Sequence, residues 1–252
     1  MLPRERKEHI LQLLELYGKI DIVELSNELT VTPMTIRRDL DALEKERKLI
    51  RTHGGAVLPQ GLIFEETYES KAGQAVEQKK LIALEASSLI KENMTILLDS
   101  GTTTLEIAKI LKYRENLTVI TTDIKIAVEL MNSKLDIIVV GGRLQNDVGA
   151  LYGSLTERTL SEMHVDIFFL GAHAVHPTIG VTTPTLEKAA VKKAMIKAAE
   201  KTFLVADSSK FNRKAFSKVC ELTSVSKLIT DQQISQEAVD EYAQYTELII
   251  AK

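Results

Sequence analysis

The sequence has one cysteine, Cys220, among 252 residues. A single thiol cannot form a disulfide within the chain, which excludes a disulfide-stapled scaffold and is typical of a reducing compartment. No apolar run approaches the roughly 18 residues that a membrane-spanning helix needs. The charged N-terminal residues also lack the apolar core of a signal peptide. The sequence therefore predicts a soluble, cytoplasmic protein.

An excess of positive charge is missing as well. The formal net charge is −3, whereas a chain that binds nucleic acid along its whole length is usually basic, so any such contact must be local. Internal repeats and low-complexity tracts are absent. Hydrophobic residues make up 44% and charged residues 27% of the chain, which is the composition of a globular protein.

Helical patterns dominate the first part of the chain. The first pattern has apolar residues at the spacing i, i+3, i+4, i+7 and is followed by Gly18, a helix stop signal. Its apolar residues are Ile10, Leu13, Leu14 and Tyr17. A second pattern begins at Asp21, whose carboxylate can cap a helix. The very short connection Thr30–Val31 leads to a third helix.

The third helix carries two adjacent arginines. Thr32 is its expected N-cap, with Pro33 in the first turn, where a missing N–H costs nothing. The apolar stripe consists of Ile36, Leu40 and Leu43. Arg38 falls on the opposite side of the helix, and Thr35 and Arg37 flank the stripe. A helix of this kind can enter a DNA major groove and meet phosphates and guanine edges.

Residues 49–58 predict a β-hairpin around Gly54–Gly55, so residues 1–58 are expected to form a winged helix-turn-helix. The candidate DNA contacts are Thr32, Thr35, Arg37, Arg38, Arg51 and His53. The alternative is a merely solvated charged face, and the ten basic and ten acidic residues of this segment give no help against it. Asp39 is expected to hold an arginine in place.

From residue 76 onward, short apolar strands alternate with amphipathic helices. The expected strands are 94–100, 117–121, 135–142, 166–172, 201–209, 225–230 and 246–251, and the expected helices are 104–113, 123–132 and 185–200, with a further helix starting near residue 76. This alternation predicts an α/β domain over residues 76–252 with a mainly parallel sheet covered by helices. Residues 59–75 read as a linker.

Polar residues cluster where these strands end, and ligands bind at that edge of a parallel sheet. The segment Asp99-Ser100-Gly101-Thr102-Thr103 lies between a strand and a helix. Its hydroxyls and free amides favour an anion such as phosphate, although serine and threonine there could simply cap the helix. Later strand ends supply Thr121, Asp123, Gly141, Gly142, Arg143, Gly171 and Lys210.

Both halves of the chain resemble the DeoR family of bacterial repressors. The stretch "LTVTPMTIRRDLDALEKERKLIRTHGGAV" matches the family's DNA-binding signature, and "DSGTTT", "TTD", "VVGGRL", "LGAHAVHPTIGVTTPT" and "LVADSSKF" match its sensor domain. The resemblance implies a sensor fold like that of ribose-5-phosphate isomerase, an operator DNA and a phosphorylated sugar effector bound at the strand ends above. No cofactor is expected. A homo-oligomer, dimer or tetramer, is expected because paired half-sites raise the affinity of a small reader.

Two positions depart from the family pattern. Lys188 stands where relatives usually have an acidic residue, with Glu187 beside it, and His173 and His176 replace small or acidic residues. Both departures lie near the expected pocket, so the resemblance does not imply which sugar is bound.

Catalysis is the alternative that an isomerase-like fold leaves open. Aldose–ketose isomerisation needs a base, and Asp99, Asp123, Asp147 and Asp207 are candidates. Fold alone does not fix chemistry, and a fused DNA reader gives ligand binding a purpose without turnover. We therefore expect a regulator and not an enzyme.

A metal site is not expected. His173 and His176 supply two ligands, fewer than the three or four that a zinc site uses. Cys220 is interpreted as a packing residue because no histidine is near it in the sequence to serve as a base.

Overall fold

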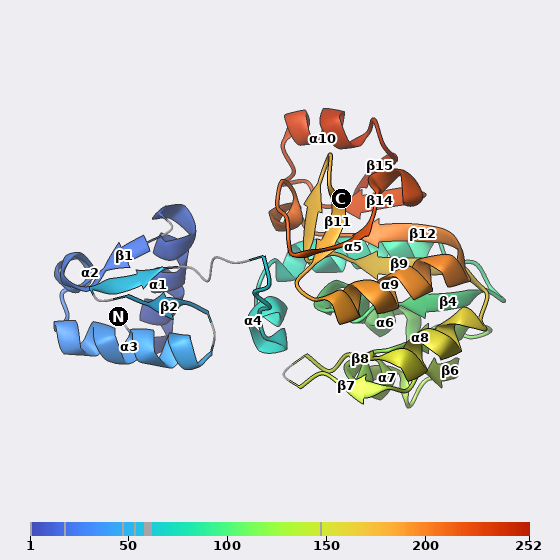
Figure 1. Ribbon diagram of the computed structural model, residues 1–252, viewed down its shortest axis with the longest axis horizontal. Helices are drawn as coiled ribbons and strands as arrows, with labels where there is room; N and C mark the ends of the chain where they lie inside the picture. The colour runs from blue at the N-terminus through green and yellow to red at the C-terminus, as the bar shows by residue number, and fades with distance from the viewer. Residues whose placement is uncertain (1, 18, 47, 53, 58–61, 147) are drawn as a thin grey trace. The chain divides into compact units, whose positions relative to one another are not determined.

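The structure is a computed structural model that describes residues 2–17, 19–46, 48–52, 54–57, 62–146 and 148–252. It divides into two compact units, one ending at Lys71 and the other beginning at Ala72 (Figure 1). The helix stop at Gly18 and the first part of the expected linker, 59–61, lie outside the described residues. Within the described part, no helix is both long and apolar enough to cross a membrane. The predicted boundaries at residues 58 and 75 remain a prediction.

The first unit consists of three helices and a small antiparallel sheet. Its elements are α1 (Pro3–Tyr17), β1 (Lys19–Asp21), α2 (Ile22–Glu28), α3 (Pro33–Lys45), β2 (Ile50–Arg51) and β3 (Gly55–Val57). The predicted hairpin is confirmed as β2 and β3, and β1 completes a sheet of order β1-β3-β2. β1 was not predicted, because three residues are too few to show an alternation of apolar and polar side chains. The short helix α4 (Tyr68–Ala72) crosses the boundary between the units.

The apolar stripes predicted for the three helices meet in one core. Its buried members are Ile10, Leu14, Ile22, Leu25, Ile36, Leu40, Leu43, Leu49 and Ala56. Tyr17 was expected in the first stripe, but its exposed fraction is 71%, so that prediction was wrong. Tyr17 is the last residue of α1, where the helix gives way to β1.

A buried ion pair joins α1 to α3. Arg6 Nε lies 2.5 Å from Asp39 Oδ2, and the two side chains are 9% and 8% exposed. Asp39 thus holds an arginine, as expected, and that arginine is Arg6. Because removal of either partner would leave a buried charge unpaired, the pair fixes how α3 is turned on the core.

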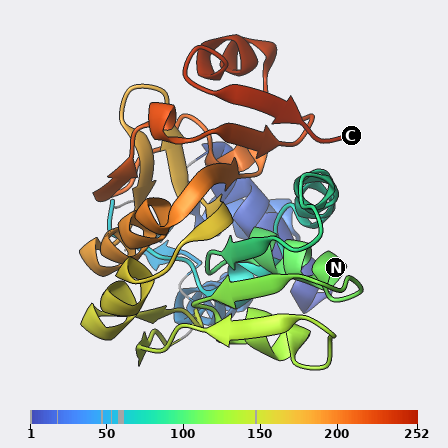
Figure 2. The same cartoon turned by 90° about the vertical axis from the view of Figure 1, so that its right-hand side faces the viewer.

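The second unit is built on a seven-stranded sheet of order β15-β14-β12-β9-β4-β5-β6, in which every neighbouring pair is parallel (Figure 2). The strands are β4 (Thr95–Leu98), β5 (Thr118–Thr121), β6 (Asp136–Val139), β9 (Val165–Gly171), β12 (Ala199–Val205), β14 (Lys227–Thr230) and β15 (Glu247–Ile250). The helices are α5 (Val76–Ser88), α6 (Thr102–Leu111), α7 (Ile124–Leu130), α8 (Ser154–Ser161), α9 (Leu186–Ala198) and α10 (Gln236–Tyr242). The predicted parallel α/β architecture is confirmed.

Smaller elements decorate this sheet. They are the pair β7 (Arg143–Leu144) and β8 (Leu151–Tyr152), the sheet β10 (Ala174–His176), β11 (Gly180–Thr183) and β13 (Ser217–Cys220), and the 3-10 turns η1 (Ser208–Lys210) and η2 (Leu222–Ser224). None of these was predicted, and neither were α8 and α10. Most of them are short, so they offer too few residues for a periodic pattern.

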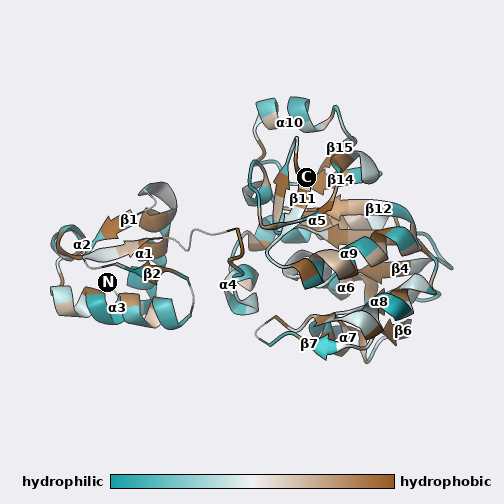
Figure 3. Cartoon of the chain, in the orientation of Figure 1, coloured by the Kyte–Doolittle hydropathy of each residue, from teal (hydrophilic) through white to brown (hydrophobic). Residues whose placement is uncertain are grey.

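Each face of the large sheet packs against a separate apolar core. Phe168 and Leu170 of β9 join a core with α8 and α9, whereas Ile167 and Phe169 join a core with α5, α6 and α7. Successive side chains of a strand point to opposite faces, so an apolar run is what burial on both faces requires. Figure 3 shows the resulting apolar colouring of central strands such as β4 and β9.

The wing offers a matched pair of glycines for a stability test. A Cβ on Gly55 would lie 1.8 Å from the Ile20 carbonyl oxygen, whereas a Cβ on Gly54 would meet only Asp21 Oδ2 at 3.5 Å. We expect Gly55→Ala to lower the free energy of unfolding by about 1–3 kcal/mol, because β1 and β3 must separate. Gly54→Ala should change it by no more than about 0.5 kcal/mol. Urea unfolding followed by circular dichroism checks both, and equal stabilities would contradict the expected packing.

Candidate functional site

The start of α3 is fixed by its own side chains. Thr32 Oγ1 accepts a hydrogen bond from the Thr35 amide at 3.2 Å, and the two hydroxyl oxygens lie 3.0 Å apart. Pro33 occupies the first turn. The predicted N-cap is therefore confirmed, and it places both threonine hydroxyls at the positive end of the helix dipole.

Arg37 and Arg38 lie on the exposed surface of α3, while Ile36 and Leu40 of the same helix are fully buried. The neighbouring Asp39 points the other way, into the ion pair with Arg6. The two guanidinium groups are thus carried by a helix whose rotation is fixed from behind.

The wing is tied to α3 by Arg51. Its Nη1 forms an ion pair with Asp41 and donates to the Arg37 carbonyl oxygen at 3.3 Å, and its amide donates to Glu44 Oε1 at 2.9 Å. In this structure Arg51 therefore positions the wing against α3. His53 lies outside the described residues.

The second unit has a topological switch point between β4 and β9. From β4 the chain builds outward through β5 to β6, and then returns to the other side of β4 as β9. Loops at the carboxyl ends of two such strands diverge and leave a crevice, which is where open α/β sheets bind ligands. Asp99 follows β4 and Gly171 ends β9, so both predicted residues flank this point.

A buried ion pair between Asp99 and Lys192 occupies the switch point. The Lys192 ammonium group contacts Asp99 Oδ2 and donates to the Gly171 carbonyl oxygen at 2.9 Å, and the Gly171 amide donates to Asp99 Oδ2 at 2.8 Å. The exposed fractions of Asp99 and Lys192 are 3% and 9%. Sequence reasoning missed Lys192, although a lysine on the apolar stripe of α9, three residues from both Ala189 and Met195, was a usable signal.

The network continues across the sheet to β5. The Ser100 amide donates to Asp99 Oδ1 at 2.9 Å, and the Ser100 hydroxyl donates to Asp123 Oδ2 at 2.8 Å. Asp123 caps α7, and its own amide donates to Thr121 Oγ1 at 3.1 Å. Burial raises the pKa of the Asp123 carboxyl above its usual range, an effect that the hydrogen bond from Ser100 partly offsets. The structure thus brings Asp99, Ser100, Thr121, Asp123 and Gly171 together.

The serine and threonine side chains at the start of α6 do not cap its first turn. The N-cap position is Gly101, which has no side chain, and the Ser100 hydroxyl is bound to Asp123. The Thr104 hydroxyl donates to the carbonyl oxygens of Asp99 and Gly101 at 2.8 and 3.0 Å. Capping therefore does not explain Ser100 or Thr104, and the amides of Thr102 and Thr103 begin the helix.

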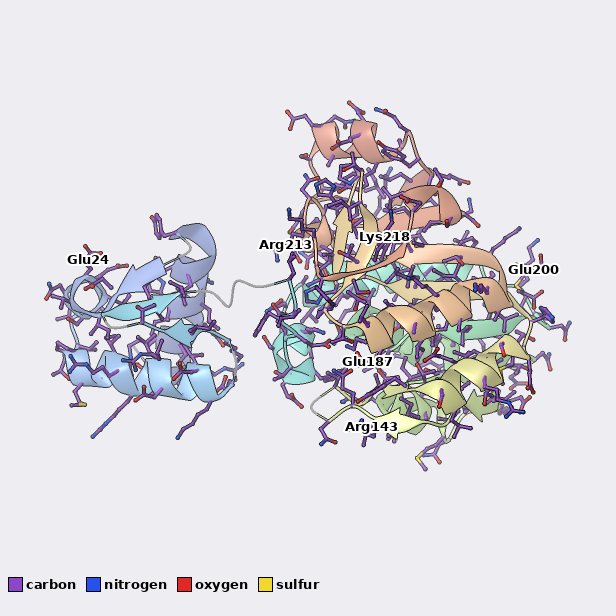
Figure 4. The ribbon with its side chains drawn as sticks, viewed as in Figure 1. Glu24, Arg143, Glu187, Glu200, Arg213 and Lys218 are labelled. Carbon is purple, nitrogen blue, oxygen red and sulfur yellow. The ribbon has the colours of Figure 1, made fainter. Side chains whose placement is uncertain are left out.

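The remaining predicted residues of the strand ends lie on either side of this network. Gly142 has no room for a side chain, since a Cβ there would be 2.0 Å from Thr156 Oγ1, and the Gly141 carbonyl oxygen accepts from that hydroxyl at 2.8 Å. Arg143 is exposed on β7 (Figure 4), and its guanidinium carbon lies 6.0 Å from the centre of the Tyr152 ring. Lys210 is half-buried in η1 after β12. These residues flank the Asp99 network from opposite sides.

The other candidate groups that the structure describes are engaged elsewhere. Asp207 accepts from the Ser209 amide at 3.1 Å and caps η1, and Asp147 lies outside the described residues. Burial raises the pKa of the Cys220 thiol to about 11, which fits the packing role predicted for it. His176 Nδ1 is bound by the Thr178 amide at 3.3 Å. Among the described side chains, no three His, Cys, Asp or Glu groups gather as a metal site would need.

Family models match both units. The DeoR-like helix-turn-helix domain matches residues 6–61, and the DeoR C terminal sensor domain matches residues 74–232.

Curated relatives extend over nearly the entire chain. The HTH-type transcriptional regulator YulB of Bacillus subtilis is 40% identical over 95% of this chain and 93% of that protein. The lactose phosphotransferase system repressor of Lactococcus lactis is 37% identical over 100% of both chains. A putative aga operon transcriptional repressor of Escherichia coli O157:H7 is 31% identical over 94% of this chain and 89% of that protein.

Solved structures show a more distant likeness. Ribose 5-phosphate isomerase A of Methanocaldococcus jannaschii is 22% identical, covers 54% of each chain and has a TM-score of 0.41.

Adjacent lysines on α9 test the role of the buried pair. Lys192→Met leaves the Asp99 carboxylate buried without its charge partner, so we expect the free energy of unfolding to fall by about 3–5 kcal/mol. Lys193 is exposed, and Lys193→Met should change it by no more than about 0.5 kcal/mol. Chemical denaturation of the full chain measures both, and a Lys192→Met variant as stable as the Lys193→Met variant would show that the pair is not structural.

Proposed function

Since the chain belongs to the DeoR family of transcriptional regulators, we propose that it is a repressor of sugar-metabolism genes whose DNA binding is controlled by a phosphorylated sugar. Two relatives carry names that point to sugar-related operons, the lactose phosphotransferase system and aga. We place the protein in the cytoplasm, in keeping with its single cysteine and its proposed operator DNA.

The observation that carries the DNA-binding part is the pair of exposed arginines on α3. Arg37 and Arg38 project from the helix surface, while the Arg6–Asp39 pair holds the opposite side against α1. An arginine on a recognition helix can form two hydrogen bonds with a guanine edge or bind phosphate. Thr32 and Thr35 at the helix start are suited to phosphate contacts, and Arg51 and His53 to the adjacent backbone.

The effector part rests on the first turn of α6 beside the switch point. The N-cap residue of α6 is Gly101, which has no side chain to cap the helix. The amides at Thr102 and Thr103 therefore begin the helix without a cap from that residue, and such a helix start favours an anion. The hydrogen bonds from Ser100 to Asp99 and Asp123 hold the strand ends of β4 and β5 in place beside this turn. Lys210 and Arg143, on either side of this edge, supply positive charge for a phosphate.

The same geometry argues against turnover. Both Asp99 oxygens are engaged, one by Lys192 and the Gly171 amide and the other by the Ser100 amide, so Asp99 is not a free base. Asp123 is fully buried and caps α7. The relatives are named as transcriptional regulators, and the chain is a regulator and not an enzyme.

A DNA-binding test uses Arg38. The probe is a duplex selected by the wild-type protein from a random-sequence library. We expect Arg38→Ala to weaken binding about tenfold or more, because one arginine–guanine contact contributes about 1–3 kcal/mol. Gel-shift titration at fixed salt measures the affinity. Arg4→Ala is the control, since Arg4 is a 91% exposed side chain of α1 that pairs with Glu8 in the next helical turn. Equal affinities of the two variants would remove Arg38 from the reader.

An effector test uses Thr102 and a panel of sugar phosphates. We expect one phosphorylated sugar, and not its unphosphorylated counterpart, to raise the Tm of the wild-type protein. Thr102→Val should lose most of that shift. Thr118→Val should keep it, because Thr118 begins β5 at the opposite end of the sheet. A panel without any hit, or an unchanged response of Thr102→Val, would contradict the assigned site.

A further inference from the structure

The loop that follows β12 carries Lys210, one of the residues proposed to meet a phosphate. Its start is capped by Asp207, and the Ser208 amide donates to Asp231 Oδ2 at 2.7 Å. Asp231 is 1% exposed and directly follows β14, the strand next to β12 in the sheet. The beginning of the loop is therefore fixed by the carboxyl end of a neighbouring strand.

The end of the loop makes a turn through Asn212. This residue has a φ of 55°, in the left-handed region that residues other than glycine adopt only at a cost in free energy. Its amide donates to the Tyr242 hydroxyl at 3.1 Å. The next amide, that of Arg213, donates to the Val175 carbonyl oxygen at 3.2 Å. The turn is thus held by β10 and by the last residue of α10.

Tyr242 is completely buried, and its hydroxyl lies among polar groups of this turn and of β10. The oxygen is 3.1 Å from the Val175 carbonyl oxygen and 3.1 Å from Asn212 Oδ1, the two acceptors that its proton can serve. Burial raises the pKa of this hydroxyl above its usual range, so it stays protonated at neutral pH. The ring packs edge-on against Phe211, with the ring centres 4.9 Å apart. Because a phenylalanine ring would fill the same space, the hydroxyl is the part of Tyr242 that joins the core to the turn.

We propose that Tyr242 is a positioning residue of the effector site, whose hydroxyl keeps the 208–213 loop in one conformation and thereby presents Lys210 to an anionic group of the ligand. This inference rests on the proposed function, in which Lys210 supplies charge for a phosphate. A cation on a loop that is already ordered loses less freedom on binding than one on a loose loop, so this preorganisation raises affinity. Tyr242 acts through Asn212 and not by contact with the ligand.

Hydrogen exchange without any ligand tests the positioning. Tyr242→Phe removes the hydroxyl and keeps the ring, so amides of residues 208–213 should exchange about three to ten times faster, as expected for the loss of one hydrogen bond. Thr246→Val is the matched control. It removes another buried hydroxyl of the C-terminal segment, one that donates to the Val225 carbonyl oxygen at 2.7 Å, and should leave the loop unchanged. Unchanged exchange in Tyr242→Phe, or equal acceleration in both variants, would overturn the inference.

Inorganic phosphate tests the consequence for binding. Phosphorus NMR titration of the full chain at fixed ionic strength gives the Kd. We expect Tyr242→Phe to raise it about three- to tenfold, because one long side chain must then be ordered on binding. Thr246→Val should keep the wild-type Kd although it also lowers the Tm. Circular dichroism establishes folding. Should Tyr242→Phe fail to fold, Asn212→Ala loosens the same turn from its exposed side and should raise the Kd in the same way.

A comparison with Lys210→Met separates this inference from the proposed function. A wild-type protein that binds phosphate no better than Lys210→Met would remove Lys210 from the effector site, and this inference would fall with it. If Lys210→Met weakens binding while Tyr242→Phe and Thr246→Val bind equally well, the proposed effector site stands and only the role of Tyr242 is overturned.

Discussion

The second unit depends on a lysine and an aspartate that neutralise each other where water does not reach. Lys192 comes from α9, Asp99 follows β4, and both bind the backbone of Gly171 at the end of β9. The pair therefore joins a helix and two strands at the topological switch point, where the order in which the chain adds strands reverses. A buried pair is weak evidence for net stability, but removing either partner is strongly unfavourable. This constraint keeps the two strand ends in register and holds Ser100, and through it Asp123, in place.

The first unit uses the same device for a different purpose. Arg6 and Asp39 are buried between α1 and α3, and neither faces the surface proposed to meet DNA. Arg37 and Arg38 belong to the same helical turn as Asp39, so the direction of all three side chains is set together. In both units, then, a buried ion pair fixes the orientation of the segment that carries its carboxylate.

Periodicity was sufficient to predict the main elements of both units. The strands of the large sheet could be predicted because burial on both faces requires apolar runs. Helix α3 could be predicted because its N-cap residue, its first-turn proline and its apolar stripe all indicate a helix over the same residues. Short elements such as β1, β7 and β8 were missed because two or three residues carry no period. Lys192 was missed for another reason: its partner is 93 residues away, and only the fold brings them together. The engagement of Arg51 with Asp41 was equally hidden, since a basic residue near a wing tip looks the same whether it is free or paired.

The proposed effector site includes the segment that follows β6. Gly141, Gly142 and Arg143 follow β6 directly, and the Gly141 carbonyl is held by Thr156 while Gly142 has no room for a side chain. The segment is thus closely packed, so its backbone is held in one position by contacts with α8 and β8. A ligand that binds one position of this segment better than another shifts the balance between the two positions by no more than the difference in its affinity.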